Sequence, residues 1–169
     1  MARNIEIKAR VADRESLEAA VGAIATAGPT PILQDDTFFA CPNGRMKLRD
    51  FSTGEGELIF YRRSDIAGPK QSEYVRVPLA AVASLREALA LGYGEIGRVR
   101  KRRTLYLVGR TRVHLDEVEG LGDFVELEVV LAEHEPAQAG VDEAADLMER
   151  LGIAPSHLVE GAYLDLARR

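Results

Sequence analysis

The chain has 169 residues, of which 46% are hydrophobic, and it carries a formal net charge of −5 and one cysteine. No Ser-, Gly- or Pro-rich linker divides it, so we expect a single domain over residues 1–169. The acidic balance argues against a general nucleic-acid coat protein. One cysteine excludes an intrachain disulfide framework and a thiolate zinc cluster.

The apolar runs of the chain are far too short to span a bilayer. The first residues lead into an expected strand rather than into an apolar leader segment. We therefore expect a soluble, cytoplasmic protein without a membrane partner.

Periodic apolar residues predict strands and helices in a definite order. A strand over about residues 4–11 is followed by a helix that Asp13 caps and that Gly28-Pro29 ends. Turn signals then separate four expected strands at residues 32–40, 45–51, 57–63 and 71–77. Pro78 is expected to open a second helix. Three more strands are expected at residues 97–108, 112–118 and 124–131, and the remainder is helical, with a last segment starting at Pro155-Ser156.

About eight antiparallel strands interrupted by helices predict an α+β fold, a closed or nearly closed antiparallel β-barrel with helices packed outside. The alternating polar face of these strands is ionic. By strand phase, the inward set has ten basic residues and four acidic ones, an excess of six positive charges. The ten basic residues are Lys8, Arg10, Arg45, Lys47, Arg49, Arg63, Arg76, Lys101, Arg103 and Arg112, and the four acidic residues are Glu6, Asp116, Glu126 and Glu128.

Such an interior must be a wet tunnel, because unpaired ions in a dry interior cost more than folding supplies. A polyanionic ligand would neutralise it. The arginines can grip phosphates by forked contacts and the lysines as point charges. Arg62, Arg100 and Arg102 have the opposite phase, so we place them outside.

Three carboxylates, Glu6, Glu126 and Glu128, are candidate ligands for Mg²⁺ or Mn²⁺. Alternatively, Glu126 and Glu128 only neutralise nearby arginines. Five further residues have open roles. His114 and Asp116 can form a metal or acid–base pair or bond within the tunnel wall, Tyr61 and Tyr74 can contact the ligand or pack, and Tyr163 can close the tunnel mouth.

Seven segments, in order across nearly the whole chain, resemble the CYTH superfamily, the triphosphate tunnel metalloenzymes. They are NIEIK (residues 4–8), GRMKLR (44–49), LIFYRR (58–63), KQSEY (70–74), VRKRR (99–103), RVHLD (112–116) and FVELE (124–128). The chain resembles the class IV adenylate cyclase branch most closely. The resemblance implies an eight-stranded tunnel, a divalent metal on the carboxylates, a triphosphate held by Lys and Arg, and a homodimer as one oligomeric state.

The opening motif of the family is Glu-x-Glu-x-Lys, and Asn4 stands here in place of its first Glu. Asn keeps an oxygen ligand but removes a charge, which leaves Glu6, Glu126 and Glu128 as the carboxylate ligands. The resemblance also implies that Lys8 touches the phosphates and acts on the nucleophile. Neighbouring Arg and Lys would lower the pKa of Lys8, as a general base requires.

The leading functional hypothesis is cyclisation of ATP to cyclic AMP and diphosphate. The first alternative is hydrolysis of thiamine triphosphate, inorganic triphosphate or a nucleoside or RNA 5′-triphosphate. The second is a polyphosphate or nucleotide binding module without catalysis. A diphosphate ester substrate ranks last, since the inward faces lack a site for a long hydrocarbon.

Overall fold

A computed structural model describes residues 1–168. In chain order the elements are β1 (Ala2–Arg10), α1 (Arg14–Ile24), β2 (Ala27–Phe39), β3 (Arg45–Asp50), β4 (Gly56–Arg63), β5 (Lys70–Leu79), α2 (Val82–Tyr93), β6 (Glu95–Val108), β7 (Thr111–Val118), β8 (Gly122–Val130), α3 (Ala137–Arg150), the 3₁₀ turn η1 (Pro155–His157) and α4 (Tyr163–Ala167). Over these described residues, no helix is both long and apolar enough to cross a membrane.

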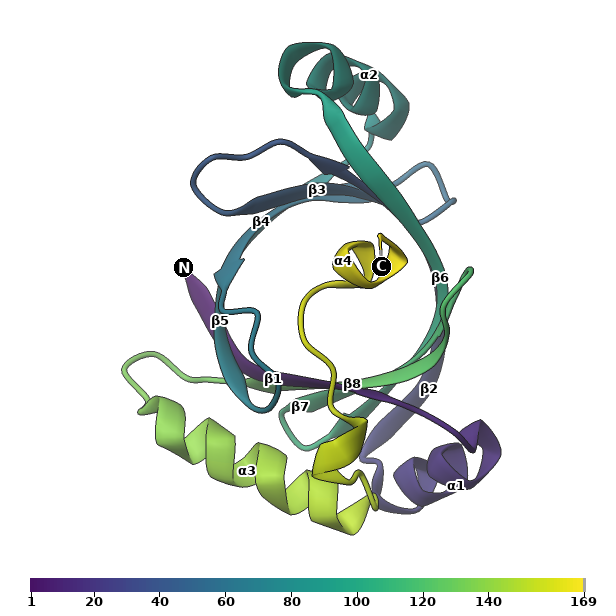
Figure 1. The fold of residues 1–169 in the computed structure, drawn as a ribbon, viewed down its shortest axis with the longest axis vertical. Helices are drawn as coiled ribbons and strands as arrows, with labels where there is room; N and C mark the ends of the chain where they lie inside the picture. The colour runs from purple at the N-terminus through teal and green to yellow at the C-terminus, as the bar shows by residue number, and fades with distance from the viewer. Residues whose placement is uncertain (169) are drawn as a thin grey trace.

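The strands form a closed antiparallel barrel in the order β1-β5-β4-β3-β2-β6-β7-β8 (Figure 1). β1 closes the ring because it pairs with β5 on one side and with β8 on the other. The predicted eight-stranded antiparallel tunnel is therefore confirmed.

Two predicted boundaries were wrong. Helix α1 ends at Ile24, before Gly28-Pro29, because the chain already joins the sheet at Thr26, whose N–H donates to the carbonyl of Leu107. Pro78 lies inside β5 and does not open α2. Its position tolerates proline because β1 stops pairing with β5 at Tyr74, so Pro78 is paired with β4 only.

The apolar face of the barrel points outward, and helices cover it. Helices α1 and α3 pack on one side of the ring, where Val21 and Leu147 contact a core that includes Ile7, Val113 and Leu127. Helix α2 covers the opposite side, at a second core around Phe39, Leu48 and Val82. Because successive strand residues point to opposite faces, these outward apolar residues leave the ionic residues between them on the inside.

Helix α4 departs from the expectation that the helices pack outside. In the view down the ring, α4 lies within the circle of strands (Figure 1). Tyr163 and Leu164 are buried against Phe38, Val99 and Phe124, at the end of the barrel where β2 leads into β3. The C-terminal segment thus closes one end of the tunnel.

The packing of α3 on β1 gives a stability test. A Cβ at Gly140 would lie 2.6 Å from Ile5 Cγ1 and 2.8 Å from Leu131 Cδ2, whereas a Cβ at Gly22 of α1 would meet nothing within 4 Å. Gly140→Ala should lower the free energy of unfolding by about 1–2 kcal/mol, because the destabilisation from overpacking is larger than the stabilisation from the higher helix propensity of alanine. Gly22→Ala should raise it by roughly 0.5–1 kcal/mol.

Urea denaturation of both variants measures these changes. A stabilised Gly140→Ala variant would show that α3 does not pack tightly on the strand that carries Glu6 and Lys8.

Candidate active site

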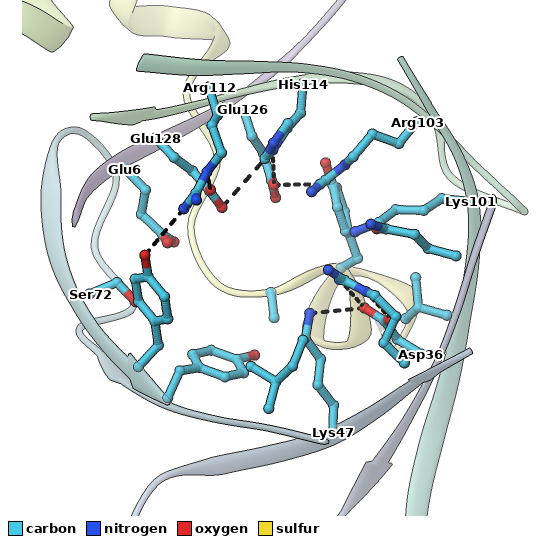
Figure 2. A pocket seen from close by; sticks show the side chains of 18 of the residues that line it. Glu6, Asp36, Lys47, Ser72, Lys101, Arg103, Arg112, His114, Glu126 and Glu128 are labelled. Carbon is cyan, nitrogen blue, oxygen red and sulfur yellow. Dashed lines mark hydrogen bonds and ion pairs between the residues drawn. The ribbon is translucent and has the colours of Figure 1, made fainter. Parts of the chain in front are cut away.

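All eight strands and α4 contribute side chains to a cavity of about 220 Å³ inside the ring (Figure 2). Its charged lining, taken over residues 1–168, has eight cations and four carboxylates, so positive charges exceed negative ones by four. The cations are Lys8, Lys47, Arg49, Arg63, Arg76, Lys101, Arg103 and Arg112, and the carboxylates are Glu6, Asp36, Glu126 and Glu128. The structure thus brings together most of the residues that strand phase placed inside.

Two basic residues that were predicted to line the interior lie elsewhere. Arg10, at the end of β1, is exposed and stacks 4.9 Å from the ring centroid of Phe124. Arg45 donates at 2.7 Å to both Asp165 and Asp65, so it ties α4 to the β4–β5 loop instead of lining the cavity. Strand phase was right in both cases, but each residue lies at a strand end, outside the enclosed length of the tunnel.

The residues assigned to the outside are indeed exposed: Arg62, Arg100 and Arg102. Arg62 donates to the carbonyl of Asn43 at 2.9 Å. Its neighbour Arg63 points inward and pairs with Glu6. One step along β4 therefore separates a surface arginine from a tunnel arginine.

The two carboxylates of β8 pair with cations from the nearby strands β1, β6 and β7. Glu126 binds Lys8 Nζ through Oε1 at 3.1 Å and Arg103 Nη2 through Oε2 at 2.7 Å. Glu128 Oε2 accepts from Arg112 Nε at 2.8 Å. Glu126 and Glu128 thus form ion pairs with nearby cations and lie together on one wall, and their ligation of a metal stays a prediction.

Burial and these ion pairs shift the pKa values of the charged side chains on β1 and β8. Burial would raise the pKa of Glu126, but Lys8 and Arg103 bring it well below its usual range, so Glu126 is ionised. The pKa of Lys8 is lowered as expected, although the chief cause is burial rather than neighbouring cations. Burial also raises the pKa of Glu6, which Arg63 opposes.

The closed end of the tunnel is built around Tyr163. Its hydroxyl donates to Asp116 Oδ2 at 2.8 Å, and the centroid of its ring lies 3.9 Å from Lys8 Nζ and 4.8 Å from Lys101 Nζ. Burial and Arg103 lower the pKa of Lys101 to about 7. Tyr163 therefore forms the floor of the site and holds two of its lysines.

Asp116, a candidate partner of His114, is fully buried behind this floor and does not line the cavity. It accepts two hydrogen bonds from Arg103, at 2.7 and 2.6 Å. Asp116 thus orients Arg103 and Tyr163 and lies too deep to contact a ligand in the cavity.

The two candidate tyrosines both line the cavity. Tyr74 OH accepts from Arg112 at 3.4 Å. Tyr61 is buried, which raises its pKa to about 12, and its ring centroid lies 5.6 Å from Lys47 Nζ. Both rings can therefore pack against a ligand while they position a cation.

Sequence reasoning missed several polar residues of the interior. Asp36 binds Lys47 at 2.9 Å and accepts a forked pair from Arg49 at 2.8 and 2.7 Å. Lys70 is buried, and this burial lowers its pKa to about 8. The same strand-phase rule finds both, since Asp36 is two residues from inward Phe38 and Lys70 is two from inward Ser72.

A cluster of metal-ligating groups lies on the wall formed by β7 and β8. One ligand atom each from His114, Glu126 and Glu128 lies within 4.8 Å of the other two. Within the part of the chain that the structure describes, the buried atoms His114 Nδ1 and Asn4 Oδ1 have no hydrogen-bond partner. Two carboxylates beside an unpaired imidazole nitrogen fit a divalent cation.

The family follows from a comparison with known proteins. The model of the CYTH domain matches residues 2–163. The chain belongs to the CYTH family. Adenylate cyclase CyaB of Aeromonas hydrophila is 26% identical to it over an alignment that covers 98% of this chain and 88% of CyaB.

Two solved structures share the fold. The PH1012 protein of Pyrococcus horikoshii superimposes with a TM-score of 0.83 at 23% identity, covering 96% of this chain and 98% of that protein. HpAC1 of Hippeastrum, described as having a dominant triphosphatase activity, gives a TM-score of 0.61 at 18% identity, covering 89% and 88%. These likenesses establish the tunnel fold.

The contrast between Arg63 and Arg62 gives a matched test of the tunnel. Arg63→Ala should weaken tripolyphosphate binding by about 10- to 100-fold, as expected for the loss of a charge-assisted contact worth about 1.5–3 kcal/mol. Arg62→Ala should leave binding within about twofold, because an exposed cation is screened by water and salt.

Isothermal titration calorimetry with tripolyphosphate measures both effects. If Arg62→Ala were the damaging substitution, the inward register of β4 would be wrong.

Proposed function

We propose that this CYTH protein is a metal-dependent enzyme that binds a triphosphate in its tunnel and converts ATP to cyclic AMP and diphosphate. The observation that carries the proposal is the enclosed cavity, with its excess of four positive charges beside a three-residue cluster of metal-ligating groups. The similarity to adenylate cyclase CyaB over almost the whole chain supports cyclisation as the reaction.

A triphosphate suits this cavity better than a smaller anion. Its phosphates can take over cations that now pair with Glu6 and Asp36, namely Arg63, Lys47 and Arg49. The enclosed volume of about 220 Å³ is smaller than the roughly 300–1,000 Å³ that holds a drug-sized ligand. The phosphate chain therefore fills the tunnel, and the nucleoside extends from the phosphates toward the open end.

The apolar lining supports this orientation. Helix α4 closes the end of the tunnel beside Lys8 and Lys101, so the nucleoside part of a bound nucleotide can extend only toward the other end. Ile32 of β2 and Leu105 of β6 line the cavity on the side away from α4. An aliphatic surface there can pack against a base.

In cyclisation, the ribose 3′-oxygen attacks the α-phosphorus, the bond from that phosphorus to the bridging oxygen breaks, and diphosphate leaves. Lys8 lies at the closed end beside Tyr163, where the terminal phosphates bind in this orientation, so the 3′-hydroxyl proton passes to water at the open end rather than to Lys8. The arginines oppose the charge that develops on the leaving diphosphate. A divalent ion, Mg²⁺ or Mn²⁺, held by Glu126 and Glu128 would neutralise further phosphate charge when bound.

Triphosphate hydrolysis is the second candidate, and the activity described for the similarly folded HpAC1 favours it. The same cations would hold the phosphates, and water would attack the terminal phosphorus instead of the 3′-oxygen attacking the α-phosphorus. Thiamine triphosphate, inorganic triphosphate and nucleoside triphosphates all present that terminal group. A binding module without turnover remains the third hypothesis.

A product assay separates these reactions. Pure protein is incubated with ATP, inorganic triphosphate or thiamine triphosphate in the presence of Mg²⁺ or Mn²⁺, and products are resolved by mass. We expect cyclic AMP and diphosphate from ATP. Glu128→Gln, which keeps the shape but removes the charge, should lower the rate by at least about 100-fold.

Orthophosphate formed together with ADP from ATP, or with diphosphate from inorganic triphosphate, would identify a hydrolase instead. Unchanged turnover in Glu128→Gln would contradict the assignment of Glu126 and Glu128 to metal-dependent chemistry. An exposed acidic control, Glu133→Gln, should retain the native rate, since Glu133 lies outside the tunnel.

A further inference from the structure

His114 is the inward residue of β7 whose environment is least explained by the fold. The residue is 4% exposed, and Nδ1 has no hydrogen-bond partner among residues 1–168. Nδ1 faces Glu126 Oε2 at 3.7 Å and Glu128 Oε1 at 4.0 Å, both too long for a hydrogen bond (Figure 2). A buried nitrogen left unpaired costs about 1–3 kcal/mol, so the site needs a partner that the protein does not supply.

The inward neighbours of His114 on β7 do have partners. Arg112 donates to Glu128 Oε2, and Asp116 accepts from Arg103. Because Arg112 holds Oε2 of Glu128, the other oxygen of that carboxylate is turned toward the imidazole. Glu126 Oε2, the second neighbour of Nδ1, accepts from Arg103 Nη2 at 2.7 Å, so an ion held by the three ligand atoms would take the place of Arg103 on that oxygen.

We infer that His114 is a nitrogen ligand of the metal site, together with Glu126 and Glu128, and that it makes the site select Mn²⁺, Co²⁺ or Zn²⁺ over Mg²⁺. Ligand atoms bound to one such ion at about 2.0–2.2 Å lie roughly 3–4 Å apart, close to the two distances from Nδ1. The inference rests on the proposed metal dependence of the enzyme.

The charges around the cluster make the imidazole an important ligand for the metal ion. Lys8, Arg103 and Arg112 already neutralise much of the charge on the two carboxylates. Position 4 offers a neutral amide oxygen rather than a carboxylate. A hard Mg²⁺ ion, which favours charged oxygen ligands and retains its waters, gains little from such a site, whereas borderline ions bind imidazole well.

Glu6, expected from the sequence to be a metal ligand, is not in this cluster. It pairs with Arg63 on the neighbouring wall. His114, rather than Glu6, is therefore the third ligand beside Glu126 and Glu128.

Calorimetric titration of metal-free protein with CoCl₂ and with MgCl₂, each with and without tripolyphosphate, tests the selectivity. Native protein should bind Co²⁺ at least about 100-fold more tightly than Mg²⁺. His114→Asn should lose about 10- to 100-fold in Co²⁺ affinity, with little change for Mg²⁺. His114→Asp, an oxygen ligand at the same position, should shift the preference toward Mg²⁺.

The matched control is His134→Asn, because His134 is an exposed histidine that also lies beside a carboxylate, 3.5 Å from Glu133. Proton NMR of the Co²⁺-loaded protein gives a direct readout of ligation. An exchangeable imidazole N–H signal, shifted far outside the normal range by the paramagnetic ion, should be present in native protein and in His134→Asn. It should be missing in His114→Asn.

Equal affinity of native protein for Co²⁺ and Mg²⁺ would overturn the inference, as would Co²⁺ binding unchanged in a folded His114→Asn variant. Turnover and Mg²⁺ binding would then still support the proposed function. If native protein bound none of these ions, with or without tripolyphosphate, both the inference and the proposed metal dependence would fail.

Discussion

An ion inside a protein needs a counter-ion, and this constraint governs the whole tunnel. Asp36 holds Lys47 and Arg49, while Glu126 holds Lys8 and Arg103. Because the strands turn their ionic face inward, their apolar face points outward and requires cover. Helices α1, α2 and α3 provide that cover, so the arrangement of the helices follows from the chemistry of the cavity.

The same ion pairs prepare the site for its ligands. The four carboxylates that line the cavity match only half of its eight cations, and with Asp116 and Glu57, which pair with Arg103 and Arg76 from behind the lining, an excess of two positive charges remains. In the function proposed above, a triphosphate would supply the missing negative charge, and a divalent ion would then take the place of cations on Glu126 and Glu128. Binding thus exchanges one set of charge pairs for another, which keeps the loss of solvation small at each step.

The sequence predicted the closed eight-stranded ring, because two-residue alternation shows which side chains share a face. It predicted Lys8 and Arg63 inside and Arg62 outside for the same reason. Alternation does not report position along the tunnel axis, so Arg10 and Arg45 were misplaced. The short α4 segment has no periodic signal of its own, and its place inside the ring depends on tertiary contacts with residues such as Phe38.

A crystal structure of the protein with tripolyphosphate and Mn²⁺, with the ion located by anomalous scattering, tests the exchange of charge pairs most directly. The account predicts phosphate oxygens on Arg63 and Lys47 inside the ring, with Glu6 and Asp36 released from them, and Mn²⁺ on the wall formed by β7 and β8. Tripolyphosphate bound outside the ring, or bound inside with the Arg63–Glu6 and Lys47–Asp36 pairs intact, would contradict it.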